Sequence, residues 1–124
     1  MAPERFDAVY SGTKSFMLNL SLALQAELAS MGIRVQAVLP GATRTELWGK
    51  AGVDVAVIPV DKLMEVDDMV DAALAGLDIG EAVTIPSLPD TSAWSRFNDA
   101  RLAMGPNLSL AQAARRYHLA GEAA

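Results

Sequence analysis

The stretch AVYSGTKSFMLNLSLALQAELASMGIRVQAVLPG, residues 8–41, decides the fold class of this chain. Residues 8–31 contain no proline and are rich in leucine and alanine, which are good helix formers, so they predict one long helix. Gly32 follows as a residue that can end this helix in a left-handed conformation. Residues 33–39 are rich in strand-forming residues and stop at Pro40-Gly41, which predicts a strand. A helix followed at once by a strand is the αβ half of a βαβ unit.

Apolar residues cover more than one face of the predicted helix. They form one stripe and a second group beside it: Phe16, Leu20, Leu24 and Leu28, then Met17, Leu18 and Leu22. A helix that is apolar nearly all round is normally buried on several sides, whereas one sheet covers only one face. The sequence therefore predicts a second layer or a partner subunit, and a homo-oligomer formed through residues 8–31.

A long irregular segment follows the first strand. Residues 42–64 hold two glycines and Pro59 and show no sustained periodicity, so they predict a loop with short helical pieces. Loops of this length in a compact domain are usually functional or mobile. Trp48 in this loop either lines a substrate pocket or anchors the loop, and the sequence favours neither.

The remaining sequence predicts three more helices and one more strand. In chain order these are a helix over residues 65–77 with an acidic first turn, a strand over residues 81–85, a helix over residues 93–104 capped by Thr91 or Ser92, and an amphipathic helix over residues 109–119. Trp94 and Phe97 lie at helical spacing and are expected in a core or an interface. Two strands are too few for a parallel sheet covered on both faces. Residues 1–124 therefore read as part of an α/β domain.

Composition places the chain among globular proteins. Of its 124 residues, 52% are hydrophobic and 20% are charged, which suits one domain. The net charge of −5 argues against nucleic acid or an anionic membrane as a partner, and no apolar run approaches the ~18 residues of a spanning helix. The absence of cysteine excludes disulfides and thiolate catalysis. His118, the lone histidine, predicts a surface residue and no metal site, and a cytoplasmic protein is the default expectation.

Chemistry is concentrated at the start of the first helix. Tyr10 and Lys14 are spaced i, i+4, which puts both side chains on one face of a helix. A phenol normally ionises at about pH 10, and a nearby ammonium and a helix N-terminus both stabilise the phenolate. Such a tyrosine can act as a general acid or base toward an alcohol or carbonyl oxygen. The pair alone is a weak motif, because a surface tyrosine beside a solvated lysine has the same spacing.

The neighbouring sequence strengthens the motif. Tyr10-Ser11-Gly12-Thr13-Lys14-Ser15-Phe16 is followed by Gly32-Ile33-Arg34-Val35 and then by Pro40-Gly41 with Thr45 four residues after the glycine. In spacing and order this resembles the catalytic region of short-chain dehydrogenases/reductases. The resemblance covers most of this chain but only about the last half of a family member. It implies an α/β fold, the C-terminal half of a Rossmann-type doubly wound parallel sheet, with the N-terminal nucleotide-binding half missing.

The resemblance also implies roles for individual residues. Tyr10 would donate a proton to the carbonyl oxygen in reduction and accept one from the alcohol in oxidation. Lys14 would hold the nicotinamide ribose hydroxyls of NAD or NADP and favour the ionised form of the Tyr10 phenol. Pro40-Gly41 would turn the chain beside the nicotinamide ring. Thr43 and Thr45 would contact the carboxamide or phosphate end of the cofactor, and residues 42–64 would form the substrate loop.

Other parts of the family pattern are absent from the sequence. No Gly-x-Gly-x-x-Gly run occurs, and the family's catalytic serine would fall before Met1. Two functional hypotheses follow. The first is an NAD(P)-dependent oxidoreductase that transfers a hydride between a nicotinamide cofactor and an alcohol or carbonyl substrate. The second is a truncated, catalytically inactive remnant that serves only as an oligomerising or interaction fragment. Neither the substrate nor the choice between NAD and NADP can be read from these residues.

Overall fold

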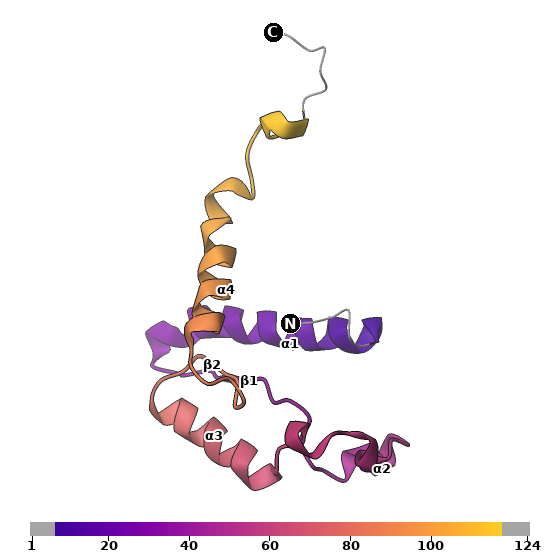
Figure 1. Ribbon diagram of the computed structural model, residues 1–124. Helices are drawn as coiled ribbons and strands as arrows, with labels where there is room; N and C mark the ends of the chain where they lie inside the picture. The colour runs from indigo at the N-terminus through magenta and orange to yellow at the C-terminus, as the bar shows by residue number, and fades with distance from the viewer. Residues whose placement is uncertain (1–6, 118–124) are drawn as a thin grey trace. The chain divides into compact units, whose positions relative to one another are not determined.

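The computed structural model describes residues 7–117 (Figure 1). The chain divides into two compact units, Met1–Ser87 and Leu88–Ala124, which are described separately. The helices and strands of the first unit are α1 (Ala8–Leu28), β1 (Ala37–Val38), α2 (Leu47–Lys50), α3 (Val66–Asp78) and β2 (Val83–Thr84). The second unit contains α4 (Ser92–Ala103). Short 3-10 turns link these elements.

Helix α1 confirms the prediction for residues 8–31. It begins at Asp7, whose carboxylate accepts hydrogen bonds from the backbone N–H groups of Val9 and Tyr10 and so satisfies two donors of the first turn. The last turn, Ala29–Met31, tightens to a 3-10 helix. Gly32 then takes a φ of 72°, as expected for a glycine that ends a helix.

The two strands are parallel, with Ala37 opposite Val83 and Val38 opposite Thr84. Both are shorter than predicted, because the strands expected over residues 33–39 and 81–85 each keep only two ladder residues. Each strand has a single neighbouring strand among the described residues. Before β1, hydrogen bonds from side chains take over from the ladder hydrogen bonds. The Arg34 side chain donates to the carbonyl oxygen of Leu77, and the Gln25 side chain donates to the carbonyl oxygen of Val35.

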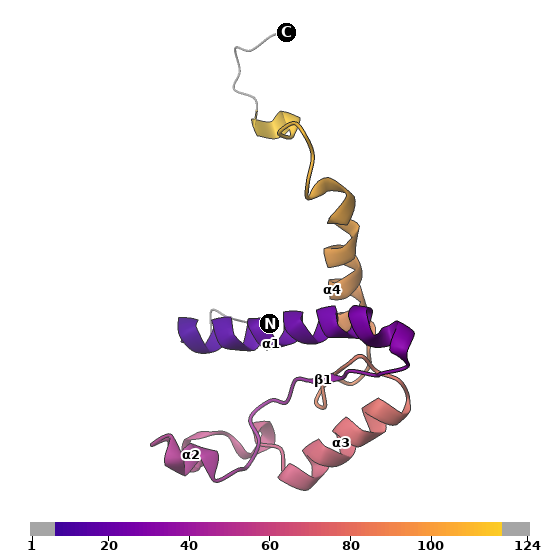
Figure 2. The same cartoon turned by 180° about the vertical axis from the view of Figure 1, so that it is seen from behind.

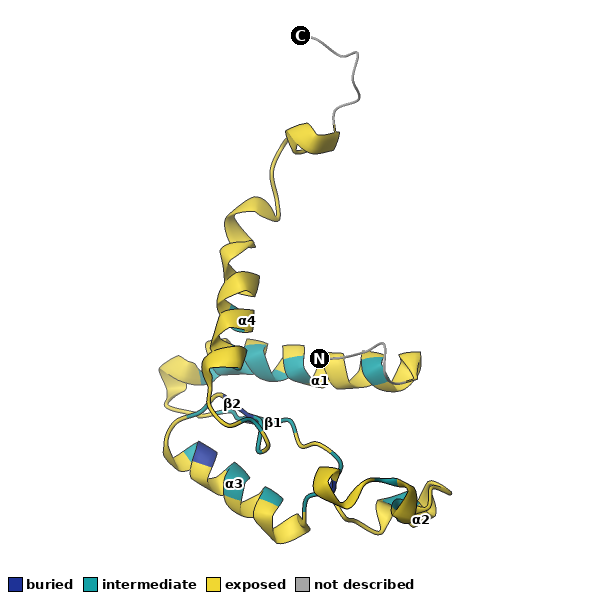
Figure 3. Ribbon diagram, in the orientation of Figure 1, coloured by how far each residue is buried: buried dark blue, intermediate teal, exposed yellow. Residues whose placement is uncertain are grey.

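Helices α1 and α3 lie on opposite faces of the two strands (Figures 1 and 2). On the α1 side, Gln25 Nε2 donates to the carbonyl oxygens of Val35 and Ala82, at 2.9 and 2.7 Å, and so joins the helix to the segments that lead into both strands. Among the described residues the buried apolar core is small, namely Ala37, Leu63 and Val83 (Figure 3). The first unit is therefore a thin α/β/α layer structure.

On the α3 side, the packing is close and polar. Gln36 Nε2 donates to Thr84 Oγ1 and to the carbonyl oxygen of Ala73, and Thr84 Oγ1 donates to Glu81 Oε2. Thr84 is buried and lies against Gly76, where a β-carbon would come within 2.9 Å of both Thr84 Cγ2 and Glu81 Oε2. Gly76 thus allows α3 to approach the strands.

The structure corrects the predicted face of α1. Of the expected stripe, Phe16 is 63% exposed and Leu20 is 39% exposed, whereas Leu24 and Leu28 are half-buried, so only the C-terminal half of the stripe is covered. The half-buried residues share the face that carries Gln25, and they include Leu18 and Leu22, which the sequence had placed off the stripe (Figure 3). The prediction is wrong for the N-terminal half of the stripe because the leucines are distributed around the helix, and the position of Gln25 over the strands decides which of them are covered.

The second unit confirms one predicted helix and contradicts another. Helix α4 agrees with the prediction over residues 93–104, but its first turn is capped differently. Thr91 makes no capping bond with its side chain, and the carboxylate of Asp90 accepts the Ser92 N–H at 2.7 Å instead.

The amphipathic helix predicted over residues 109–119 is wrong within the described residues, where only the 3-10 turn Arg115–Tyr117 forms. Leu108 and Leu110 are 74% and 65% exposed, so no packed apolar face stabilises a short helix there. Trp94 and Phe97 contact each other with ring centroids 5.6 Å apart, but Phe97 is exposed and the pair forms no core. His118 lies outside the described residues. Within residues 7–117, no helix combines the length and apolarity needed to cross a membrane.

Candidate active site

Tyr10 and Lys14 lie together in the first turns of α1, as their spacing predicts. Lys14 Nζ is 5.2 Å from the centroid of the Tyr10 ring, within the range of a cation–π interaction. Both side chains are accessible, with Tyr10 51% exposed. The Asp7 cap fixes the backbone of this turn, since one of its two hydrogen bonds goes to the N–H of Tyr10 itself. An accessible phenol and an ammonium are therefore held side by side at a capped helix start.

The turn after β1 is the second part of the site. The last hydrogen bond of the strand pair runs from Leu39 N to the carbonyl oxygen of Thr84, at 2.8 Å, and Pro40-Gly41 follows directly. A β-carbon built on Gly41 would meet no atom within 4 Å, so the backbone there borders open space. The two predicted cofactor threonines differ: Thr45 is exposed, whereas Thr43 is buried and its hydroxyl donates to the Gly41 carbonyl oxygen at 3.3 Å.

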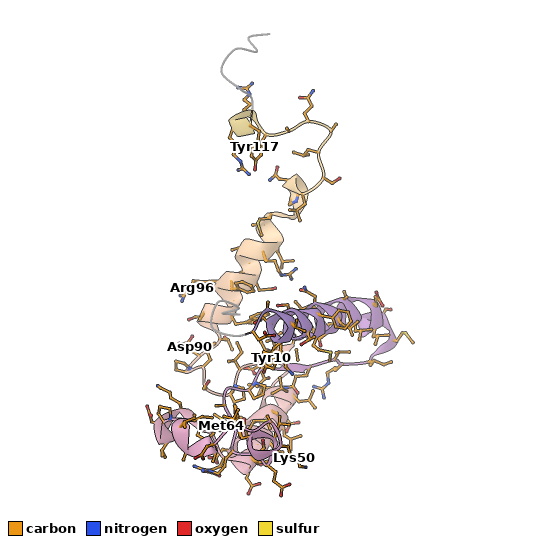
Figure 4. The ribbon with its side chains drawn as sticks, turned by 90° about the vertical axis from the view of Figure 1, so that its right-hand side faces the viewer. Tyr10, Lys50, Met64, Asp90, Arg96 and Tyr117 are labelled. Atoms are coloured by element: carbon orange, nitrogen blue, oxygen red, sulfur yellow. The ribbon has the colours of Figure 1, made fainter. Side chains whose placement is uncertain are left out.

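Helix and strand geometry brings these two parts to the same edge of the sheet. The tight turn at Gly32 reverses the chain, so α1 and β1 run in opposite directions. From Leu28 back to Tyr10 the helix rises about 27 Å. From Ile33 to Gly41 the extended chain covers up to about 26 Å. The start of α1 therefore lies level with the turn after β1. Figure 4 looks at this side of the molecule and shows Tyr10 above Met64 and Lys50 of the loop.

The predicted loop over residues 42–64 is confirmed, but its two ends are fastened together. Thr43 forms a parallel bridge with Met64, in which Met64 N donates to the Ala42 carbonyl oxygen and Arg44 N donates to that of Met64. Arg44 Nε also contacts Glu65 Oε1 at 2.7 Å. Trp48 Nε1 donates to the Thr43 carbonyl oxygen at 2.6 Å, so this tryptophan anchors the loop.

Several residues that hold the site in place could not be predicted from the sequence. Arg44, Glu65 and Gln25 carry no motif, because a single arginine, glutamate or glutamine is common on any surface. Their partners lie 10 to 57 residues away along the chain, and only the fold pairs them.

A hollow of about 310 Å³ lies at the opposite end of the two strands, where the chain enters β1 and β2. Residues from the end of α1, from the chain before β1 and from the turn before β2 line it, among them Gln25, Gly32, Arg34 and Glu81. It contains neither Tyr10 nor any residue of the turn after β1, so the chemistry and the hollow are at opposite ends of the strands. In the part of the chain that the structure describes, no group of three or more His, Asp or Glu side chains could hold a metal ion.

The geometry of a parallel α/β unit with a Tyr-x-x-x-Lys helix agrees with comparisons to known proteins. Residues 2–56 match the family of short chain dehydrogenases. A diacetyl reductase [(S)-acetoin forming] of Staphylococcus epidermidis is 25% identical over 99 residues, which are 80% of this chain and 38% of the reductase.

Solved structures extend the likeness to nearly the whole chain. A short-chain dehydrogenase from Sphingobium yanoikuyae in complex with NADPH is 51% identical with a TM-score of 0.85, and the match covers 94% of this chain and 44% of that protein. A bulky-bulky ketone specific alcohol dehydrogenase from Comamonas testosteroni is 43% identical with a TM-score of 0.78, over 94% of this chain and 42% of that enzyme.

The two parallel strands with a helix on each face fit a Rossmann-type α/β fold. The chain belongs to the short-chain dehydrogenase/reductase family. It spans less than half the length of each of these relatives.

Proposed function

We propose that this chain supplies the acid–base half of an NAD(P)-dependent oxidoreductase that interconverts an alcohol and a carbonyl compound. The observation that carries the proposal is the Tyr10 and Lys14 pair, held side by side at the start of α1, which the helix and strand lengths put at the same end of the strands as the open turn at Gly41. In open α/β sheets, ligands bind outside the carboxyl ends of the strands, and this is the edge where both parts of the site lie.

The residues at this edge suit the nicotinamide end of a cofactor. Lys14 is exposed and its ammonium can donate to ribose hydroxyls, while Gly41 leaves room for a flat ring to approach the backbone. The exposed Thr45 can reach the carboxamide or a phosphate. The Thr43 hydroxyl donates to the Gly41 carbonyl oxygen, so it could accept from the carboxamide N–H as it stands but would have to break that bond to donate to a phosphate. A bound nicotinamide would supply or accept the hydride.

The protein's own part is proton transfer. In reduction, the Tyr10 phenol donates its proton to the carbonyl oxygen as negative charge develops on it; in oxidation, the phenolate takes the proton from the alcohol. The Lys14 ammonium beside the ring would oppose the negative charge that the phenol oxygen carries after it has given up its proton. The substrate class is a ketone or secondary alcohol, which the diacetyl reductase and the ketone-specific alcohol dehydrogenase among the relatives support.

The complete activity needs groups that are not among these 124 residues. The sequence has no glycine-rich run of the kind that holds a pyrophosphate at a helix N-terminus. We therefore assign the chain the C-terminal half of a doubly wound sheet, to which the nucleotide-binding strands would add at the free edges of β1 and β2. The parallel pairing of these strands and the helices on both faces support this assignment.

A second role, self-association through α1, rests on a separate observation. Phe16 and Met17 are 63% and 55% exposed on α1, and helical spacing puts Phe16 on the side opposite Gln25. Exposed apolar residues gathered on one element favour an interface. The two roles are compatible, and a homo-oligomer formed through α1 remains part of the proposal.

A chimera tests the oxidoreductase proposal. The 124 residues replace the matching segment of the Sphingobium yanoikuyae dehydrogenase, and NADPH-dependent reduction of a panel of ketones is followed by absorbance. The chimera is expected to reduce at least one of these ketones. Lys14→Ala should raise the KM for the cofactor and lower kcat, because the ammonium serves both the ribose and the phenol. Arg96→Ala, which removes an exposed cation of α4 outside the substrate loop, is the control and should leave both constants unchanged. A folded chimera without activity would contradict the proposal.

A further inference from the structure

The segment Ala42–Arg44 is hydrogen-bonded along both of its edges. Its pairing with Met64 uses the carbonyl oxygen of Ala42 and the N–H of Arg44. In an extended strand the groups of the intervening residue point to the other side, so the Thr43 carbonyl oxygen faces away from Met64. The indole N–H of Trp48 donates to that oxygen at 2.6 Å. The Trp48 side chain thus supplies the hydrogen bond that a neighbouring strand would otherwise donate to the Thr43 carbonyl oxygen.

This hydrogen bond fixes more than one side chain, because Trp48 belongs to α2. The carbonyl oxygen of Trp48 accepts a hydrogen bond from Val53 N at 2.9 Å, so the turn that ends α2 is tied to the same residue. The first half of the loop, residues 42–53, is therefore linked through Trp48 to the turn that follows β1. The far end is held separately by Leu63, which is buried, and by the Arg44–Glu65 ion pair.

The second half of the loop has no such fastening. Residues 54–62 contain two 3-10 turns, Val55–Val57 and Val60–Lys62, and only Val55 and Ile58 among these nine residues are half-buried. Val57 and Val60 in this stretch are 72% and 80% exposed. Apolar side chains this open on a loop beside a site can be buried on an apolar ligand when the loop closes.

We infer that Trp48 is a positioning residue that joins the first half of the substrate loop to the turn after β1, so that opening and closing are confined to residues 54–62. The inference rests on the proposed function for the ligand that the loop covers. In this inference Val57 and Val60 contact the apolar part of the substrate when the loop closes. The Trp48 indole N–H does not bind the substrate directly while it donates to the Thr43 carbonyl oxygen.

Hydrogen exchange on the 124-residue chain tests the inference without cofactor or turnover. The informative amides are those of Arg44 and Met64, which are the donors of the Thr43–Met64 bridge. Trp48 is replaced by β-(3-benzothienyl)alanine, which keeps the size and shape of the indole but has sulfur in place of N–H, so packing survives. Trp48→Phe is a second variant. Trp94→Phe, in the second unit, is the control for loss of an indole.

The account predicts that both Trp48 variants raise the exchange of the Arg44 and Met64 amides by about tenfold, the size expected when a partly buried carbonyl loses its donor. Exchange across residues 54–62 should be fast in every variant and unchanged by the substitution. In the active chimera, Trp48→Phe should raise the KM for the cofactor severalfold while kcat per folded enzyme changes less. Equal exchange in the Trp48 and Trp94 variants would overturn the inference and leave the oxidoreductase proposal to the chimera assay.

Discussion

The two ends of β1 are held in different ways. Before the strand, side chains tie the chain down: Gln25 reaches it from α1, Gln36 reaches α3, and Arg34 donates to the carbonyl oxygen of Leu77. After the strand, Gly41 borders open space and Thr45 is exposed. The difference indicates where a ligand can bind: the side chains of Gln25 and Arg34, which line the hollow before the strand, already donate to backbone carbonyl oxygens, whereas the backbone at Gly41 and the side chain of Thr45 remain accessible.

A pair of glycines provides the strongest test of this contrast within one chain. Gly76→Ala places a methyl against Thr84 Cγ2 and Glu81 Oε2 on the fastened side. Overpacking of this kind costs about 1–3 kcal/mol, which exceeds the roughly 1 kcal/mol that alanine gains over glycine in a helix. The free energy of unfolding in urea should therefore fall.

Gly41→Ala is the matched control for that substitution. Its new methyl meets no atom within 4 Å, and Gly41 is not among the glycines with positive φ. Its stability should stay within about 0.5 kcal/mol of the unaltered chain, as is usual for surface substitutions. Equal losses in the two variants would contradict the contrast between the two ends.

Substitution of Gln25 is a more specific test of the hydrogen bonds before β1. Gln25→Leu keeps a side chain of similar size and removes the donor to the Val35 and Ala82 carbonyl oxygens. Ala82 retains the N–H of Ala37 as a partner, so Val35 is the group left without a donor. A loss of about 1–2 kcal/mol in the free energy of unfolding is expected. Gln112→Leu, at an exposed position of the second unit, should change it little. A stabilised Gln25 variant would show that apolar packing alone holds α1 on the strands.

The smallest expected effect concerns Asp90 and depends on pH. The Ser92 hydroxyl, followed by the Ser92 backbone N–H, lowers the pKa of the Asp90 carboxyl below its ordinary value. A lowered pKa in the folded state means that the contribution to stability is complete above the unfolded value of about 3.9 and is lost as pH falls through the folded value. The start of α4 should therefore fray only in acid.

The test for Asp90 is local, because the carboxyl is fully exposed. Amide NMR shifts of Ser92 and its neighbours should titrate in the unaltered chain with a midpoint below the ordinary pKa of an Asp carboxyl. Asp90→Asn should abolish this titration, and Asp99→Asn, further along the same helix, should leave it in place. A Ser92 signal that titrates identically in Asp90→Asn would show that another group is responsible.

Local signals in the sequence were enough to predict much of the fold and the two parts of the candidate site. The long helix up to Leu28 and Gly32, the order of helix and strand, and the i, i+4 pair of Tyr10 and Lys14 all depend on neighbouring residues, and the structure confirms them. The face on which α1 packs could not be predicted, because it depends on Gln25 reaching carbonyl groups that are 10 and 57 residues away.

Tertiary context also explains the errors in length and type. The strands around Ala37 and Val83 shorten because each has one described neighbouring strand, and β propensity alone does not report how many strands are present. The apolar residues near Leu108 suggested a helix but find no surface to pack on among the described residues of their unit. The anchoring role of Trp48 needed the position of the Thr43 carbonyl oxygen, which no sequence pattern specifies.

The most direct test of the central claim is the turnover of the Tyr10→Phe variant in the chimera. The substitution keeps the ring, and with it the contact to the Lys14 ammonium, but deletes the proton that the proposed chemistry transfers. The account predicts that kcat falls by about 10²–10⁴, the range for loss of a general acid or base. Tyr117→Phe removes the hydroxyl of the other tyrosine, which is 64% exposed in the second unit, and should leave kcat unchanged. Full activity in a folded Tyr10→Phe chimera would contradict the claim that the start of α1 and the turn after β1 form an acid–base site.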